Sequence, residues 1–180
     1  MQKVLSFIGI LVASSLTIAL SPYYMSNWNI SDDYNIRFSG RGAEGTFKGL
    51  QGTVDFDPQN LSNARMDVQV DVKTIDTGNS TKNRHAKGDS WFDAAKYPLI
   101  KFRSKRFARS SSGYVVTGDL TLHGTTKEVR IPFTFSERTN GGLFEGKFNV
   151  NREEYGIEGP LFSFTVAEEF EIELRVPVSE

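Results

Sequence analysis

The chain offers few residues with the chemistry of a catalytic or metal site. It contains 180 residues, with two histidines and no cysteine. The missing cysteines exclude disulfides, thiolate catalysis and cysteine-ligated metals, and two histidines supply little for a metal cage. His85 and His123 fall in separate expected loops without His-Glu-x-x-His spacing, and no serine sits in a Gly-x-Ser-x-Gly segment. The sequence predicts no metal, no cofactor and no catalytic residues, and indicates a protein that is not an enzyme.

Cationic side chains remain as candidates for binding a polar group. The densest basic cluster lies at 101–109, and most of it is expected on a solvated outer stripe. On an unbroken strand alternation, however, Arg106 falls on the inward side with Ile100 and Phe102. An inward arginine near a strand end can pair with a phosphate. A β-bulge before Phe107 would turn Arg106 outward.

Two further polar residues are expected in structural roles. Arg152 is predicted to lock a turn by pairing with a carboxylate such as Asp93 or Glu154. His123 is expected to hydrogen-bond the backbone within a Leu-His-Gly turn.

The remaining candidate residues lie in the segment 80–97, which is the one segment that departs from a β pattern. Ser80 is a candidate N-cap for a first helical turn, a second turn is expected over Trp91–Lys96, and Pro98 prevents continuation. The segment is therefore predicted to be a short helical flap.

The flap holds three candidate site residues. His85 lies among basic neighbours, where it can touch a ligand headgroup or cap a turn. Trp91 and Phe92 are candidates for a movable lid, which would plug a tunnel mouth or dip into a lipid surface. The alternative is a flap that packs permanently over the barrel end.

Alternating apolar and polar residues predict an all-β fold. The pattern is clearest over 64–73, where Ala64, Met66, Val68 and Val70 share one side and polar residues the other. About eight such segments occur, and most are separated by short turns that suit antiparallel neighbours. Closure removes exposed sheet edges. The prediction is an antiparallel eight-stranded barrel with a short helical flap at about 80–97.

The inward positions of this barrel are almost wholly aliphatic or Phe. An eight-stranded barrel is either just filled by side chains or just wide enough for one small ligand. Both interpretations stay open at this point: a packed core, or a tunnel for an acyl or prenyl chain. The candidates for tunnel-lining residues are Phe38, Phe56, Val68, Val70, Phe102, Val116, Leu120, Phe133, Phe135, Phe148 and Ile172.

The N-terminus has the pattern of a signal peptide. Lys3 precedes an uncharged, mostly apolar run at 4–20. We expect a signal peptide at 1–20, a tether at 21–27 and a single barrel domain at 28–180, with the mature protein periplasmic or secreted. The alternative is an uncleaved membrane anchor formed by residues 4–20.

The overall charge limits the classes of partner that the protein can attract. The chain carries 21 Lys and Arg against 22 Asp and Glu, a net charge of -1. Such a balance supplies no long-range field to collect nucleic acid. Nucleic acid is therefore not an expected partner.

Six segments in order carry a resemblance to a known family: 28–30, 45–58, 75–85, 91–104, 118–129 and 151–157. They make the chain, from Trp28 to about Val178, similar to the YceI-like family of secreted, lipocalin-like barrels that bind polyisoprenoid lipids. A departure lies near Tyr34 to Ala43, where many relatives have histidines that this chain lacks. Any headgroup role of those histidines does not transfer.

The resemblance implies a function that the pattern alone does not give. It implies an isoprenoid tail in a buried channel, with a polar headgroup near one mouth, in a protein that carries or sequesters the lipid without catalysis. The expected partner is an isoprenoid lipid or quinone-like ligand, with transient membrane contact. The alternative function is a ligand-free structural or stress-protective barrel outside the cytoplasm. An enzyme acting on an isoprenoid would depend on His85 or Arg106.

Overall fold

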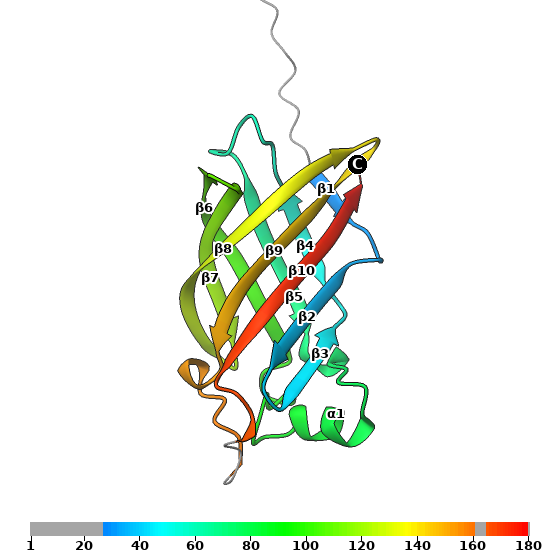
Figure 1. The fold of residues 1–180 in the computed structure, drawn as a ribbon, viewed down its shortest axis with the longest axis vertical. Helices are drawn as coiled ribbons and strands as arrows, with labels where there is room; N and C mark the ends of the chain where they lie inside the picture. The colour runs from blue at the N-terminus through cyan, green and yellow to red at the C-terminus, as the bar shows by residue number, and fades with distance from the viewer. Residues whose placement is uncertain (1–26, 161–164, 180) are drawn as a thin grey trace, which may run out of the picture.

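The structure is a computed structural model that describes residues 27–160 and 165–179 (Figure 1). The expected signal peptide and nearly all of the tether lie outside these residues. One antiparallel sheet contains β1 (Asn27–Ile30), β2 (Asn35–Gly40), β3 (Ala43–Phe47), β4 (Gln51–Asp55), β5 (Arg65–Asp71), β6 (Leu99–Ser110), β7 (Gly113–Leu122), β8 (Thr125–Arg138), β9 (Gly141–Asn151) and β10 (Glu169–Ser179). The helices are the 3₁₀ turns η1 (Val72–Thr74) and η2 (Glu153–Tyr155), and α1 (Ser80–Ala86).

The sheet closes into a barrel through its first and last strands. The order β1-β4-β5-β6-β7-β8-β9-β10 returns to β1 because Asn29 pairs with Ser179 and Ile30 with Val178. The β2–β3 hairpin continues the wall where β2 pairs with 171–175 of β10. The predicted antiparallel eight-stranded barrel is confirmed. β1 and β2 both pair with β10, at different levels of that strand, so together they occupy one strand position of the barrel.

The strand alternation puts charge outside and hydrocarbon inside. Along β8, exposed residues alternate with buried or half-buried ones, as a strand with one wet face requires. On the outer face, Lys147 of β9 forms ion pairs with Glu171 and Glu173 of β10. These carboxylates raise the pKa of Lys147, and Lys147 in turn lowers the pKa of Glu173.

The two ends of the barrel differ. At one end of the barrel, β1 begins and β10 finishes (Figure 1). The interior near this end holds a cluster of aromatic rings, in which Phe56 contacts Phe133, Phe135 and Phe144. At the other end lie α1, the β2–β3 turn and the described residues 152–160 and 165–168, between β9 and β10. This second end holds the candidate site.

The flap is helical over less than half of its predicted length. Asn79, and not Ser80, is the N-cap of α1, because its side chain accepts from the backbone N–H groups of Thr81 and Lys82. The expected second helix at 91–96 is a series of turns. Asp93 has a φ of 43°, in the left-handed region, and this conformation interrupts a helix.

Candidate functional site

The barrel encloses an apolar cavity of about 430 Å³. Most of the predicted tunnel residues line it, namely Phe38, Val68, Val70, Phe102, Val116, Leu120, Phe133, Phe148 and Ile172. Several of them, such as Phe148 and Ile172, face inward yet stay half-buried. An inward side chain keeps exposed surface where it borders open space, so the middle of the barrel is hollow. A cavity of this size suits a small-molecule ligand.

Two predicted lining residues do not reach the cavity. Phe56 is 1% exposed, and the centre of its ring lies 5.1 Å from that of Phe135. The ring of Phe135 in turn lies 5.7 Å from that of Trp28. All three belong to the cluster that closes one end. Strand parity assigned both Phe residues correctly to the inside, but parity carries no information on height along the barrel.

Other lining residues were not singled out from the sequence. Phe144, Leu174 and Val176 have the inward parity of their strands, so the pattern contained a signal for them. Ile75 and Ile157 lie outside regular strands and had no periodic signal. The further large apolar side chains along the cavity are Ile30, Ile36, Phe47, Leu50, Val54, Met66, Ile100, Leu122, Ile131, Val150 and Phe170.

The cavity reaches the surface beside α1. Lys82 and His85 border it and are themselves exposed. Ala86, on the next turn of α1, borders it as well. We call this opening, between α1 and the described residues 152–160 and 165–168, the mouth. His85 thus lies at the edge of the cavity, and its contact with a ligand stays a prediction.

A polar network fixes α1 to the wall. Asn83 donates from Nδ2 to Oδ1 of Asp76 at 3.0 Å and accepts at its own Oδ1 from the backbone and hydroxyl of Thr77. Asp76 also exchanges backbone hydrogen bonds with Thr46 of β3. The hydrogen bonds from Asn83 and from the backbone N–H of Gly78 lower the pKa of the Asp76 carboxyl. None of the residues of α1 is buried, so these hydrogen bonds hold the helix at the mouth together with the packing of the half-buried Ala86 against the apolar lining.

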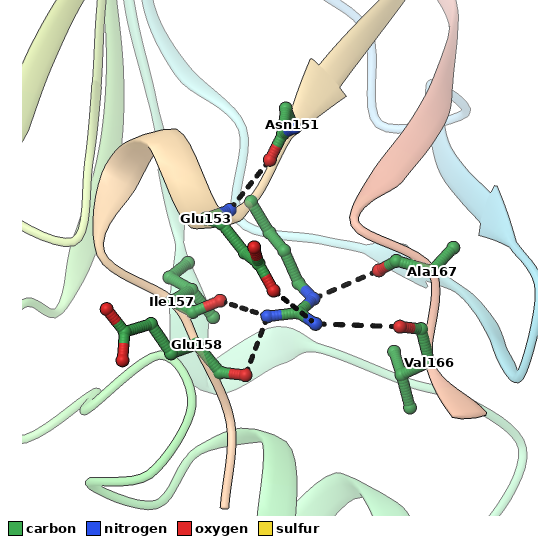
Figure 2. Close-up of polar contacts among 7 residues, drawn as sticks. Asn151, Glu153, Ile157, Glu158, Val166 and Ala167 are labelled. Atoms are coloured by element: carbon green, nitrogen blue, oxygen red, sulfur yellow. Dashed lines mark hydrogen bonds and ion pairs between the residues drawn. The ribbon is translucent and has the colours of Figure 1, made fainter. Parts of the chain in front are cut away.

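Arg152 is the buried cation of the mouth, with 6% of its surface exposed. Its guanidinium donates to the carbonyl oxygens of Ile157, Glu158 and Ala167, at 2.8 Å for Glu158 and 3.0 Å for Ala167 (Figure 2). A longer hydrogen bond of 3.5 Å reaches Val166. One side chain therefore holds two separate stretches of the segment between β9 and β10.

The predicted structural role of Arg152 is correct, but its partners differ from those expected. Its ion pair, at 3.2 Å, is with the neighbouring Glu153. Of the two carboxylates that we expected, Glu154 pairs with Lys127 of β8 instead. The main partners of Arg152 are backbone carbonyls, which a side-chain charge pattern cannot reveal.

Trp91 and Phe92 lie where the lid was expected, and both border the cavity. The Phe92 ring packs edge-on against Phe47 of β3, with ring centres 5.8 Å apart. The guanidinium of Arg152 lies 5.5 Å from the centre of the Trp91 ring. Both aromatic residues thus cover the mouth from the flap side, and their movement stays a prediction.

Arg106 is a correction, since it points away from the cavity. A β-bulge lies between Ser104 and Arg106, so Ser104 pairs with Gly118 and Arg106 with Thr117. The bulge shifts the alternation by one residue, which turns Phe107 inward and leaves Arg106 exposed. Arg106 is therefore no candidate for binding a headgroup inside the barrel.

Of the other cations of this cluster, Arg103 and Lys105 lie on the outer face, as expected, whereas Lys101 is exposed but borders the cavity. Lys105 pairs with Asp119 and Glu128 of the neighbouring strands, and these carboxylates raise its pKa. Arg103 pairs with Asp67.

His123 lies outside the cavity lining, in the β7–β8 turn. Its φ of 51° is left-handed, and its Nδ1 lies 3.2 Å from the carbonyl oxygen of Tyr155. Its ring packs edge-on against Tyr97 at 4.5 Å between centres. The contact with a backbone carbonyl matches the role expected for this residue.

Among residues 27–160 and 165–179, no three His, Asp or Glu side chains are grouped so that they could hold a metal ion. Over the same ranges, no helix has the length and apolar character needed to cross a membrane. The chemistry that the described site offers is an apolar interior with a small polar rim.

Comparison with known proteins places this geometry in a family. The model of the YceI-like domain matches residues 15–178. A UPF0312 protein of Pseudomonas savastanoi is 34% identical over 136 residues, which cover 71% of each chain. A UPF0312 protein of Photorhabdus laumondii is 39% identical over 85 residues, and this chain spans only 44% of its length.

Solved structures share the fold. BcnA of Burkholderia cenocepacia has a TM-score of 0.78 at 26% identity, covering 83% of this chain and 99% of that one. A polyisoprenoid binding domain from Saccharophagus degradans has a TM-score of 0.64 at 12% identity, with 87% and 99% covered. The second likeness is one of fold alone. With a family model that matches most of its length, the chain belongs to the YceI-like domain family.

Proposed function

We propose that this protein binds the tail of an isoprenoid-type lipid in the barrel cavity and carries or sequesters it without catalysis. The observation that carries the proposal is the cavity itself, which is lined by aliphatic and aromatic side chains and opens at one end. Hydrocarbon chains bind such surfaces by dispersion contacts and burial. A polar substrate would find few partners there.

The energetics favour exchange with a membrane over capture from water. Each buried methylene is worth about 0.8 kcal/mol against water, so a long prenyl tail would exceed the roughly 20 kcal/mol ceiling on noncovalent affinity. Transfer from the bilayer into an apolar cavity exchanges one hydrocarbon environment for another. The tail then adds little net affinity, and the headgroup decides which lipid is kept.

The polar part of the ligand belongs at the mouth. Lys82 and His85 border the opening and are exposed, so they can donate hydrogen bonds to an oxygen-rich headgroup. Trp91 and Phe92 border the cavity at the same opening. Transient contact of this end with a lipid surface would let a tail pass directly between bilayer and cavity. A quinone fits the same arrangement, with its ring at the mouth.

The comparisons support this proposal. The Saccharophagus degradans domain is described as polyisoprenoid binding, and it shares the barrel. The apolar N-terminal run supports export, with the barrel placed in the periplasm or outside the cell. Fractionation of cells expressing the full chain would test export, and recovery in the cytoplasm would contradict it.

Organic extraction of the purified full-length protein, followed by mass spectrometry, tests the proposed function. We expect a prenyl lipid or prenylated quinone at near-stoichiometric amount, and stripped protein should take up such a lipid from vesicles. A protein that carries no lipid and takes up none would contradict the proposal. It would favour the alternative of a ligand-free structural barrel.

A further inference from the structure

Aromatic rings form the closed end of the cavity, and only the first layer of these rings borders the cavity. Phe133 and Phe144 are the two rings that both line the cavity and contact Phe56. Phe56 itself is 1% exposed and does not line the cavity. We call Phe133 and Phe144 the floor, and Phe56 is the ring behind it.

Behind the floor, rings continue without a break. The centre of the Phe56 ring lies 5.2 Å from that of Tyr114, 5.9 Å from that of Phe107 and 5.4 Å from that of Phe144. Interiors packed in this way leave little free volume. A tail that enters from the mouth therefore stops at the floor.

Gly146 contributes no side chain to the space directly in front of the floor, because a Cβ there would lie 2.8 Å from the Pro132 carbonyl oxygen and 3.3 Å from Cβ of Phe133. Gly146 lies on β9 with the inward parity of Phe144 and Phe148, and it borders the cavity. Its neighbours across the sheet are Phe133 on β8 and Leu174 on β10. A larger residue at this level would fill the last part of the cavity.

We propose that the floor, and Phe144 in particular, sets the length of isoprenoid tail that the cavity accepts; this inference rests on the proposed function. An extended peptide residue spans about 3.5 Å over three backbone bonds. An isoprene unit adds four bonds to its chain, so by the same length per bond it spans about 4.7 Å when extended. The separation of the Phe144 and Phe56 ring centres, 5.4 Å, is close to this length. Removing the Phe144 ring makes Phe56 the new floor and adds room for about one unit.

The experiment measures binding of a series of all-trans prenols, from two to six isoprene units, to the full-length protein and its variants. In the parent protein, affinity rises with each unit until the tail reaches the floor, and then levels off. Phe144→Ala should move this limit one unit longer, so that the first prenol beyond the parent limit gains at least tenfold in affinity. Leu174→Phe, which fills the space in front of the floor, should move the limit one unit shorter.

Phe148→Ala is the matched control for Phe144→Ala. Phe148 lies four residues further along β9 on the same face, about 13 Å nearer the mouth along the strand. The same deletion there widens the cavity without deepening it, so the length limit should stay. Circular dichroism reports on folding, and if Phe144→Ala does not fold, Phe144→Leu replaces it with a smaller expected gain.

The outcomes separate this inference from the proposed function. If the parent protein binds no prenol of any length, the proposed function fails and the inference with it. If the parent binds prenols but folded Phe144 and Leu174 variants keep its length limit, the floor does not select tail length. A limit that moves equally in Phe148→Ala would also overturn the role of the floor.

Discussion

Arg152 and Trp91 meet across the mouth, with the guanidinium carbon 5.5 Å from the centre of the indole ring. Arg152 belongs to the segment between β9 and β10, and Trp91 to the part of the flap that follows α1. Arg152 also donates hydrogen bonds to the carbonyl oxygens of Ile157 and Ala167. Its contact with Trp91 therefore links the segment between β9 and β10 to the flap.

Loss of Arg152 should destabilise the protein strongly. Arg152→Gln leaves several buried carbonyls without their charged donor, and removing one partner of such a buried network typically costs about 3 kcal/mol or more. Urea unfolding followed by circular dichroism measures the loss. Arg37→Gln is the control, because Arg37 pairs with Glu44 on the outer surface and should change stability little. Equal losses in both variants would contradict the assigned role of Arg152.

The two tryptophans lie at opposite ends of the barrel and can report separately on ligand binding. Trp91 borders the cavity at the mouth, whereas Trp28 donates from Nε1 to the carbonyl oxygen of Phe56 in the closed end. In Trp28→Phe, lipid uptake should shift the fluorescence emission of Trp91 to shorter wavelength, because the ligand displaces water from its surroundings. In Trp91→Phe, the emission of Trp28 should stay constant. The reverse pattern would place the tail at the other end.

The anchor of α1 predicts a pH dependence. Hydrogen bonds from Asn83 and Gly78 lower the pKa of Asp76, so the ionised carboxylate stabilises the folded state. Because the folded pKa lies below the unfolded value, this stabilisation is present above about pH 4 and is lost as the pH falls through the folded pKa.

Asn83→Ala tests that anchor. It should raise the pKa of Asp76 toward its usual value and increase hydrogen exchange of the α1 amides. An NMR titration of the Asp76 carboxyl measures the first effect. Thr81→Ala, an exposed change on the same helix, is the control. An unchanged Asp76 pKa in Asn83→Ala would show that other groups hold the carboxylate.

Obstruction of the cavity should reduce lipid uptake. Val70 lines the cavity, and Val70→Trp would fill much of its width. The lipid taken up from vesicles at saturation should fall by more than half, with β-type circular dichroism retained. Asp67→Trp places the same side chain on the outer face of β5 and should leave uptake unchanged. Unchanged uptake in Val70→Trp would mean that the tail runs elsewhere.

The strands could be predicted because alternation is a direct consequence of a wall with water on one side. The same rule failed at Arg106, where a bulge shifts the register by one residue. Nothing in the local sequence marks the bulge, since Lys105 and Arg106 are both compatible with an outward position. The prediction of a second flap helix was wrong for a similar local reason, because Asp93 adopts a left-handed conformation.

The lining of the cavity was predictable in kind but not in extent. Parity separates inside from outside, so it puts Val68 and Phe148 on the inner face, where both border the cavity. It cannot separate a hollow level from a filled one, and Phe56 was therefore assigned to the lining although it lies behind the floor. Ile157 reaches the cavity through a loop that Arg152 shapes, and such a placement depends on tertiary contacts alone.

The pairing of Asn29 with Ser179 brings the two described ends of the chain together at one end of the barrel. Both described ends of the chain sit at the end remote from α1 (Figure 1). An affinity tag or surface linker at either one would leave the opening clear. Barrels immobilised in this way would all present their entrance to the solution, which makes the fold suitable for a lipid-capturing layer or a fluorescent sensor.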